Sequence, residues 1–379
     1  MNNNIFSPLY SRYFQKDHSI SSWDVFRSKE EDFAKPLSKM KVDFSSKTIN
    51  SSSLPRWMVV VVKIVLFLTK IMIFPWGLYE LVKYSAQRFV MFNLYPAQNS
   101  IVKLFAENFI GFAGLDKARL QATKMLVSQG YIVRHVVLEK DQNRYSGLLI
   151  GHKNTISNGK WALQATGNFE PIEHSVVDFA NIYHGVNCNL LMVNGPGVGR
   201  SEGIAVPKTM GEAQEVGISF LEESVKAKKL IIAGRSLGSV AVGEAVLQHS
   251  FKENIQYTVL RQMSFDSVSN IAKKIIGSSL PKLKNIAEKL VKWTGCEIDS
   301  LKASKRLQEL GITEVIVQAS DKVNGQIVIA DDGVIPAKAS LARRVAKEKV
   351  TKNKILYCLG KVDHMLTDSR LLAPEARIF

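Results

Sequence analysis

A serine stands at the centre of the pentapeptide Gly-Arg-Ser-Leu-Gly, which spans residues 234–238. A serine hydroxyl is a weak nucleophile unless a base activates it, and flanking glycines permit the tight turn that presents it. The pattern G-x-S-x-G is short, so its surroundings decide its meaning. An apolar strand is predicted before the motif, at 229–234, and a helix of small residues after it, at 238–248. This context predicts that Ser236 is a nucleophile at the carboxyl end of a strand.

A nucleophilic serine needs a histidine as its general base. In proteins with such a strand–turn–helix elbow, the chain order is serine, acid, histidine. Only His249 and His364 follow Ser236. His249 lies near the end of the helix that leaves the elbow, too close along the chain to turn back. His364 follows the last predicted strand, on a loop at 361–365, and is therefore the predicted general base.

Three aspartates follow the strand predicted at 314–320 and are candidates for the acid that orients the histidine. We favour Asp332, then Asp331, then Asp321, because Asp332 opens the turn Asp-Gly-Val-Ile-Pro. A hairpin predicted around the Asn-Gly pair at 324–325 separates the strand from this turn. The order of preference among the three aspartates therefore stays open.

The negative charge that develops on an attacked carbonyl needs two N–H donors. Leu237, which directly follows the serine, is predicted to supply one. Asn168, in the Thr-Gly-Asn run after the strand predicted at 160–167, is predicted to supply the other. Three widely spaced cysteines and no recognisable ligand pattern predict neither a metal site nor a cofactor.

Alternating strands and helices must position these residues. Apolar strands separated by helices are typical of a mostly parallel sheet that is covered on both faces. The first two strands, 131–138 and 145–152, are joined by a short polar turn and are predicted to be antiparallel. A helical cap insert is predicted at about 266–300. Within it, a stripe of Leu283, Ile286, Leu290 and Trp293 is flanked by lysines, which suits either packing on the protein core or docking on an anionic membrane.

A long apolar run precedes this body, at residues 57–74. Its length suits a membrane-spanning helix, but Lys63 and Lys70 make full insertion costly, so an interfacial or packed helix is also open. The excess of basic residues, 50 against 34 acidic, favours an anionic neighbour; aromatics are not interleaved with the basic clusters, which disfavours nucleic acid. The first residues lack the apolar core of a cleavable signal peptide.

The sequence thus divides into four predicted parts. These are a polar N-terminal segment at 1–55, a membrane-associated hydrophobic helix at 56–83, a helical connector at 84–130 and an α/β domain at 131–379. We expect a membrane location, single-pass or peripheral. The sequence leaves the orientation and the oligomeric state open.

These pieces together resemble the α/β-hydrolase superfamily over about residues 130–379. The elbow Gly-Arg-Ser-Leu-Gly resembles that of its intracellular and membrane-bound serine hydrolases. The run at 194–203 resembles their R-G-x-G-x-S-x-G loop, and Asp-Asp-Gly-Val-Ile-Pro resembles their D-D-x-V-V-P turn, which also points to Asp332. Thr166 stands where they have the histidine of H-G-N. The polar N-terminus followed by an apolar run also resembles the chlamydial CHLPS-type proteins.

The resemblance implies a membrane-associated serine hydrolase that cleaves an ester or thioester, with an acyl lipid as a candidate substrate. Ser236 would attack, His364 would carry the proton, and Asp332 would orient His364. The alternative is a catalytically silent hydrolase fold that acts as a membrane-anchored interaction module, because a fold does not by itself confer an activity.

Overall fold

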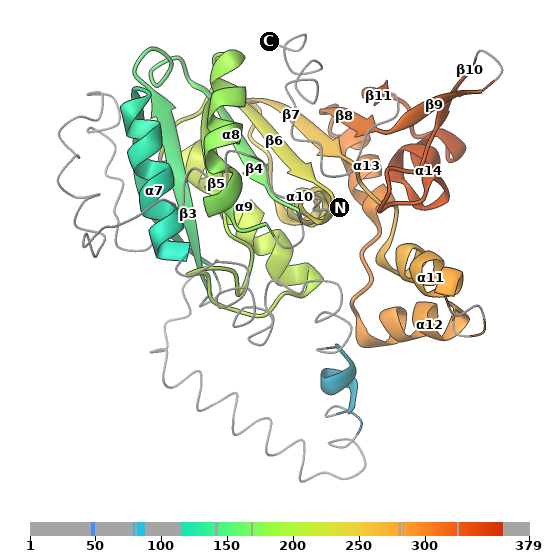
Figure 1. Ribbon diagram of the computed structural model, residues 1–379. Coiled ribbons are helices and arrows are strands. Elements are labelled where there is room, and N and C mark those ends of the chain that lie inside the picture. Colours follow the sequence, from blue (N-terminus) through green and yellow to red (C-terminus); the bar gives the residue numbers. More distant parts are fainter. Residues whose placement is uncertain are drawn as a thin grey trace, which may run out of the picture.

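The computed structural model describes residues 47–49, 79, 82–87, 115–140, 143–167, 170–279, 282, 284–323 and 326–358 of the 379-residue chain. Its main feature is one twisted sheet (Figure 1). The strands of this sheet are β1 (Lys47–Ile49), β2 (Tyr131–Lys140), β3 (Asn143–His152), β4 (Lys160–Ala165), β5 (Asn189–Val193), β6 (Lys229–Arg235), β7 (Gln256–Gln262), β8 (Thr313–Gln318) and β11 (Lys354–Cys358).

The strand order is β1-β2-β3-β5-β4-β6-β7-β8-β11. β3 pairs antiparallel with β2 and with β5, whereas the other neighbours in the sheet pair in parallel. The predicted antiparallel opening pair is therefore confirmed. The order doubles back at β5 and β4, so β4 lies at the centre of the sheet. β6 lies between β4 and β7 and is parallel to both, so the carboxyl ends of these three strands lie at one edge. This topology confirms the predicted α/β-hydrolase fold class.

Helices cover both faces of the sheet, as near-continuously apolar strands require. α7 (Leu115–Ser128) and α8 (Ile172–Gly185) pack together on one face, over a core that includes Leu126, Phe179 and Tyr183. α9 (Pro207–Glu223), α10 (Leu237–Gln248) and α13 (Ser300–Glu309) cover the other face. α14 (Leu341–Lys347) packs on α13 and β8, after the short η4 turn (Ala337–Ala339).

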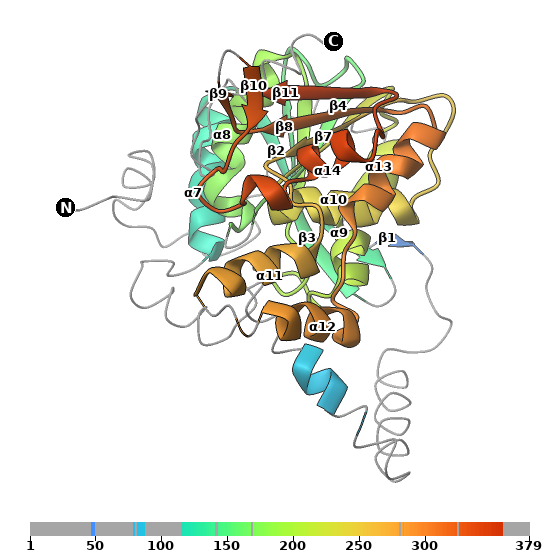
Figure 2. The same cartoon turned by 90° about the vertical axis from the view of Figure 1, so that its right-hand side faces the viewer.

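Two further helices form a cap beside the sheet. α11 (Val268–Ser279) and α12 (Lys284–Thr294) follow β7, at the place where the sequence predicts a helical insert, and they pack against each other. Figure 2 shows this pair projecting from the body, with the helical segment 82–87 beside α12. Val268, Ile271 and Val291 of the cap share a buried cluster with Leu237. The inner side of the cap is thus packed next to the elbow.

The predicted hairpin after β8 is confirmed. β9 (Ser320–Val323) and β10 (Gln326–Ile329) pair antiparallel, with Ser320 opposite Ile329. The backbone N–H of Ala330 donates to the carbonyl of Ala319 at 3.0 Å. This bond closes the base of the hairpin. The chain therefore returns to the carboxyl end of β8 before the turn that contains the candidate acid Asp332, here called the acid turn, begins.

No helix within the described residues is long and apolar enough to cross a membrane. The run at 57–74, on which the prediction of a membrane-spanning helix depends, lies outside those residues. The free thiols of Cys188 and Cys296 are buried.

His249 lies at the end of α10 that is opposite Ser236, in a cluster with side chains of α9, β7 and β2. Its Nδ1 lies 3.1 Å from Glu215 Oε1 and its Nε2 lies 2.8 Å from Glu222 Oε1, both on α9. Tyr257 of β7 donates to the same Glu222 oxygen at 2.6 Å, and Lys140 of β2 forms an ion pair with Glu215. This cluster gives His249 a structural role, which agrees with its exclusion as the general base.

Because of these contacts, the contribution of His249 to the stability of the fold depends on pH. Burial lowers the pKa of His249, but the hydrogen bonds and charges of Glu215 and Glu222 outweigh burial and raise it above its usual value. The stabilisation is therefore complete below a pH of about 6.5 and is lost as the pH rises through the raised pKa.

We expect His249→Gln to lower the free energy of unfolding by about 3 kcal/mol at acid pH, because two buried carboxylates each lose one charged partner. The difference from the wild type should shrink as the pH rises through the raised pKa of His249. Urea unfolding across this pH range measures it. The control is His152→Gln. Burial lowers the pKa of His152, so this residue does not add the same stabilisation at acid pH. A constant difference at every pH would contradict the prediction.

Candidate active site

The elbow places Ser236 between a strand and a helix. β6 ends at Arg235 and α10 begins at Leu237, and Ser236 between them has φ 52° and ψ −121°. A positive φ is strained for a residue with a side chain and persists only where the surroundings hold it. Here the Ser236 N–H donates to the Gln262 carbonyl at the end of β7, at 2.8 Å. The half-buried serine therefore sits at the carboxyl edge of the sheet, as the motif predicts.

Both glycines of the motif are required by close backbone contacts. A Cβ atom on Gly234 would lie 2.5 Å from the Gly238 carbonyl oxygen. A Cβ atom on Gly238 would lie 2.3 Å from the carbonyl oxygen of Thr166 and 2.6 Å from that of Ala165. The first turn of α10 thus rests directly on the end of β4, which brings the elbow and the loop after β4 together.

Of the two predicted oxyanion donors, Leu237 lies within the described residues. Leu237 is the first residue of α10, so its N–H has no acceptor within the helix and lies at the positive end of the helix dipole. Asn168, the second predicted donor, lies outside the described residues. Its neighbour Gly167 is close to Ser236, because a Cβ atom there would lie 3.7 Å from the Cβ of Ser236.

Two contacts hold the ends of this loop. The hydroxyl of Thr166 donates to the carbonyl of Glu170 at 2.6 Å. Arg235, directly before Ser236, donates to the carboxylate of Glu170 at 2.6 Å, and its side chain is almost fully buried. Thr166, where the resemblance has histidine, therefore closes the loop through its hydroxyl. The motif alone did not reveal the link between Arg235 and Glu170, because it joins residues that are far apart in the chain.

Among the three candidate acids, the structure places Asp332 in the most enclosed position. Asp332 is 2 % exposed, and its Oδ1 accepts the N–H groups of Val334 at 3.0 Å and Ile335 at 2.7 Å. Asp331 is exposed and accepts the N–H of Ala337. Asp321 lies within β9 of the hairpin. Because the hairpin closes at its base, Asp332 occupies a turn just beyond the carboxyl end of β8.

His364, the predicted base, lies outside the described residues. β11 ends at Cys358, and its pairing with β8 is parallel, so the chain leaves the sheet at the same edge as Ser236 and the acid turn. The individual roles of Ser236, Asp332 and His364 remain predictions.

The sequence analysis did not single out Asp266, a buried carboxylate at the same edge. It follows β7 by four residues, and its two oxygens accept the Asn270 amide at 3.1 and 2.8 Å. Burial raises the pKa of Asp266, although these hydrogen bonds oppose it. Its position directly after an apolar strand is the signal that could have identified it.

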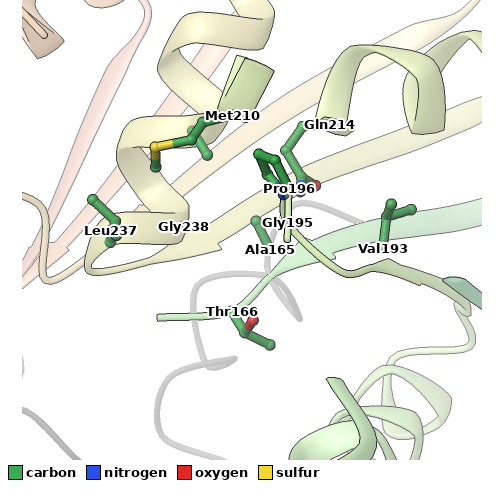
Figure 3. A pocket seen from close by; sticks show the side chains of 10 residues that line it. Ala165, Thr166, Val193, Gly195, Pro196, Met210, Gln214, Leu237 and Gly238 are labelled. Atoms are coloured by element: carbon green, nitrogen blue, oxygen red, sulfur yellow. The ribbon is translucent and has the colours of Figure 1, made fainter. Parts of the chain in front are cut away.

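A small cavity of about 20 Å³ opens beside the elbow (Figure 3). It is lined by the end of β4, the loop after β5, α9 and the start of α10, including Thr166, Pro196 and Leu237. Gln214 of α9 also lines it, and its buried Oε1 has no hydrogen-bond partner within the described part of the chain. This volume suits one water-sized group rather than an acyl chain. Nothing in the local sequence distinguishes Gln214 from other polar helix residues.

The loop after β5 is not a nucleotide-binding loop. Asn194, at its start, donates to the carboxylate of Glu173, which also forms a buried ion pair with Arg119. α9 begins only at Pro207, so no helix follows the loop directly to bind a phosphate. Among the described residues, no group of acidic, histidine and cysteine side chains is arranged to hold a metal ion.

The sheet order and the serine elbow define a protein of the α/β-hydrolase fold. The sequence profile of the Chlamydia CHLPS protein family (DUF818) matches residues 38–369, and the chain belongs to this family. None of the curated proteins compared with it is detectably similar in sequence.

Solved structures of other proteins are similar to this chain, and the one with a TM-score above 0.5 supports the fold. An α/β hydrolase from Vibrio vulnificus has a TM-score of 0.53 and 17% identity over 77% of this chain and 91% of its own. The esterase Pf2001 from Pyrococcus furiosus has a TM-score of 0.44 and 16% identity over 67% of this chain and 90% of its own. At such identities the similarity concerns the fold.

Proposed function

We propose that this protein is a membrane-associated serine hydrolase that cleaves an ester or thioester, with an acyl lipid as the candidate substrate. The observation that carries the proposal is the strained backbone of Ser236 at the junction of β6 and α10. A non-glycine residue held at φ 52° needs support from its surroundings, and the contacts of Gly234, Gly238 and Gln262 provide it.

The proposed reaction has two stages. Ser236 Oγ attacks the acyl carbonyl while His364 takes its proton, and the N–H groups of Leu237 and Asn168 stabilise the oxyanion. His364 then returns the proton to the leaving alcohol or thiol, which leaves an acyl group on Ser236. Water, activated by the same histidine, releases the acid and restores the serine. Asp332 orients the imidazole and stabilises its charged form.

Two features support the membrane part of the proposal. The apolar run at 57–74 precedes the hydrolase-fold domain, and the net charge of +16 favours an anionic surface. The cap helices add exposed apolar and basic side chains near the elbow.

The alternative is a silent fold that serves as an interaction module. The replacement of histidine by Thr166 favours it, because a motif residue of active relatives is absent. The described contacts weaken this objection, since Thr166 closes the loop beside Ser236.

A fluorophosphonate probe, which labels activated serines, distinguishes the two functions. We expect labelling of the detergent-solubilised wild type, and its loss in both Ser236→Ala and His364→Ala. Ser128→Ala, which alters an exposed serine of α7, should label like the wild type. A folded wild type that does not react would favour the silent module, as would labelling that persists in Ser236→Ala.

A further inference from the structure

The outer face of the cap is more apolar than a face in contact with water needs to be. Ile286 of α12 is 60 % exposed and Trp293 is 37 % exposed. They lie seven residues apart and so share one side of the helix. Ala287 and Val291 of α12 are buried, and Leu290 of the stripe packs against the buried cluster that contains Val291. The sequence left two possibilities for this apolar stripe, packing on the protein core or docking on an anionic membrane. Ile286 and Trp293 are exposed and therefore do not pack on the core.

The segment before the hydrolase body extends this face. The rings of Tyr79 and Trp293 meet edge to face, with centroids 6.0 Å apart. Cys296, just after α12, lies 3.9 Å from the carbonyl oxygen of Gln87. Figure 2 shows the segment 82–87 on the side of α12 away from the sheet. Val82 on this segment is 49 % exposed, so the apolar surface continues from the cap onto it.

Exposed lysines surround these apolar side chains. Lys282, Lys289 and Lys292 are exposed on or beside α12. The acidic residue among them, Glu288, forms ion pairs with Lys273 and Lys292, at 2.7 and 2.8 Å. Apolar side chains projecting between lysines suit the boundary between headgroups and acyl chains of an anionic bilayer.

We propose that Tyr79, Val82, Ile286, Lys289 and Trp293 form a face, here called the cap face, that docks on an anionic lipid bilayer. Charge complementarity supports this partner, and so does the apolar run that ends at Phe74, five positions before Tyr79. The inner side of the same cap packs in one cluster with Leu237. Docking would therefore hold the Ser236 elbow close to the lipid surface. This inference deepens the membrane association proposed above and does not depend on the activity of Ser236.

Fluorescence of Trp293 tests the proposal on the full chain. Brominated acyl chains quench tryptophans that enter a bilayer, and the difference between the wild type and Trp293→Phe isolates the signal of Trp293. We expect this difference signal to be quenched in vesicles that contain phosphatidylserine. The corresponding difference for Trp161→Phe, a fully buried tryptophan of β4, should not be quenched.

Two variants test which side chains are responsible. Ile286→Glu should abolish the quenching of Trp293, whereas Leu310→Glu, at an exposed apolar residue outside the cap face, should leave it unchanged. Lys289→Gln should weaken quenching in phosphatidylserine vesicles, with an apparent affinity roughly fivefold lower, and should have little effect in phosphatidylcholine alone. Both cap variants should keep the fluorophosphonate reactivity of the wild type in detergent.

The proposal would be overturned if the chain co-floats with the vesicles but Trp293 is not quenched, because another segment would then bind the membrane. Burial of Trp293 by a second copy, seen as a doubled mass without quenching, would also overturn it. Neither outcome bears on the hydrolase function, which the probe measures without lipid.

Discussion

Asp332→Asn should lower the turnover of a short-chain p-nitrophenyl ester by about 10⁴-fold, the loss expected when the acid of a serine triad is neutralised. The substitution keeps nearly the same shape. Its amide oxygen can still accept the N–H groups of Val334 and Ile335, so the turn and the fold should be retained. What is lost is the charge that stabilises the imidazolium and selects the tautomer of His364.

The neighbouring aspartates provide the controls. Asp331→Asn should change turnover by less than about tenfold, because Asp331 is exposed and its carboxylate accepts a local backbone N–H, that of Ala337. Asp266→Asn tests the other buried carboxylate at this edge of the sheet. Equal losses in Asp331→Asn, or a larger loss in Asp266→Asn, would assign the acid elsewhere. A melting temperature for each variant separates lost chemistry from lost folding.

Gly238→Ala should destabilise the protein by roughly 3 kcal/mol or more, and should also abolish probe labelling. The added Cβ would lie 2.3 Å from the carbonyl oxygen of Thr166, which belongs to the backbone and cannot turn aside. α10 and the end of β4 must therefore separate. That movement displaces the N–H of Leu237 and the backbone of Ser236 together.

Gly185→Ala is the matched control. Gly185 is the last residue of α8, and a Cβ atom there meets nothing within 4 Å. Its effect on the free energy of unfolding should stay within about 1 kcal/mol. Chemical denaturation followed by circular dichroism measures both variants. If Gly238→Ala were as stable as Gly185→Ala and still reacted with the probe, the close packing of the elbow on β4 would be wrong.

The sequence was sufficient for the parts of the fold that depend on local pattern. The apolar strand before Ser236 and the small-residue helix after it appear in the structure as β6 and α10. The opening antiparallel pair and the hairpin around 324–325 were predicted from turn residues and alternation. Each of these depends on residues near one another in the chain, which is why their types and spacing were enough.

Contacts between distant segments could not be predicted in the same way. The sequence left Asp331 and Asp332 as rivals because they are adjacent. In the structure Asp332 is buried and accepts the N–H groups of Val334 and Ile335, whereas Asp331 is exposed. The role of His249 depends on two glutamates of another helix. Asn168 and His364 lie outside the described residues, so their roles stay predictions from the sequence.

The elbow and the α/β class were predictable from the sequence, because backbone geometry and hydrophobic periodicity are local properties, whereas the order of serine, acid and histidine stays a prediction. The contact between Arg235 and Glu170 became visible only in three dimensions, as did the burial of Ala287 and the exposure of Ile286 on α12. An amphipathic stripe indicates that a helix has an apolar side. Which side is buried depends on contacts with segments far away in the chain. Here Leu290 and Val291 pack on the buried cluster beside the elbow, whereas Ile286 of the same helix stays exposed.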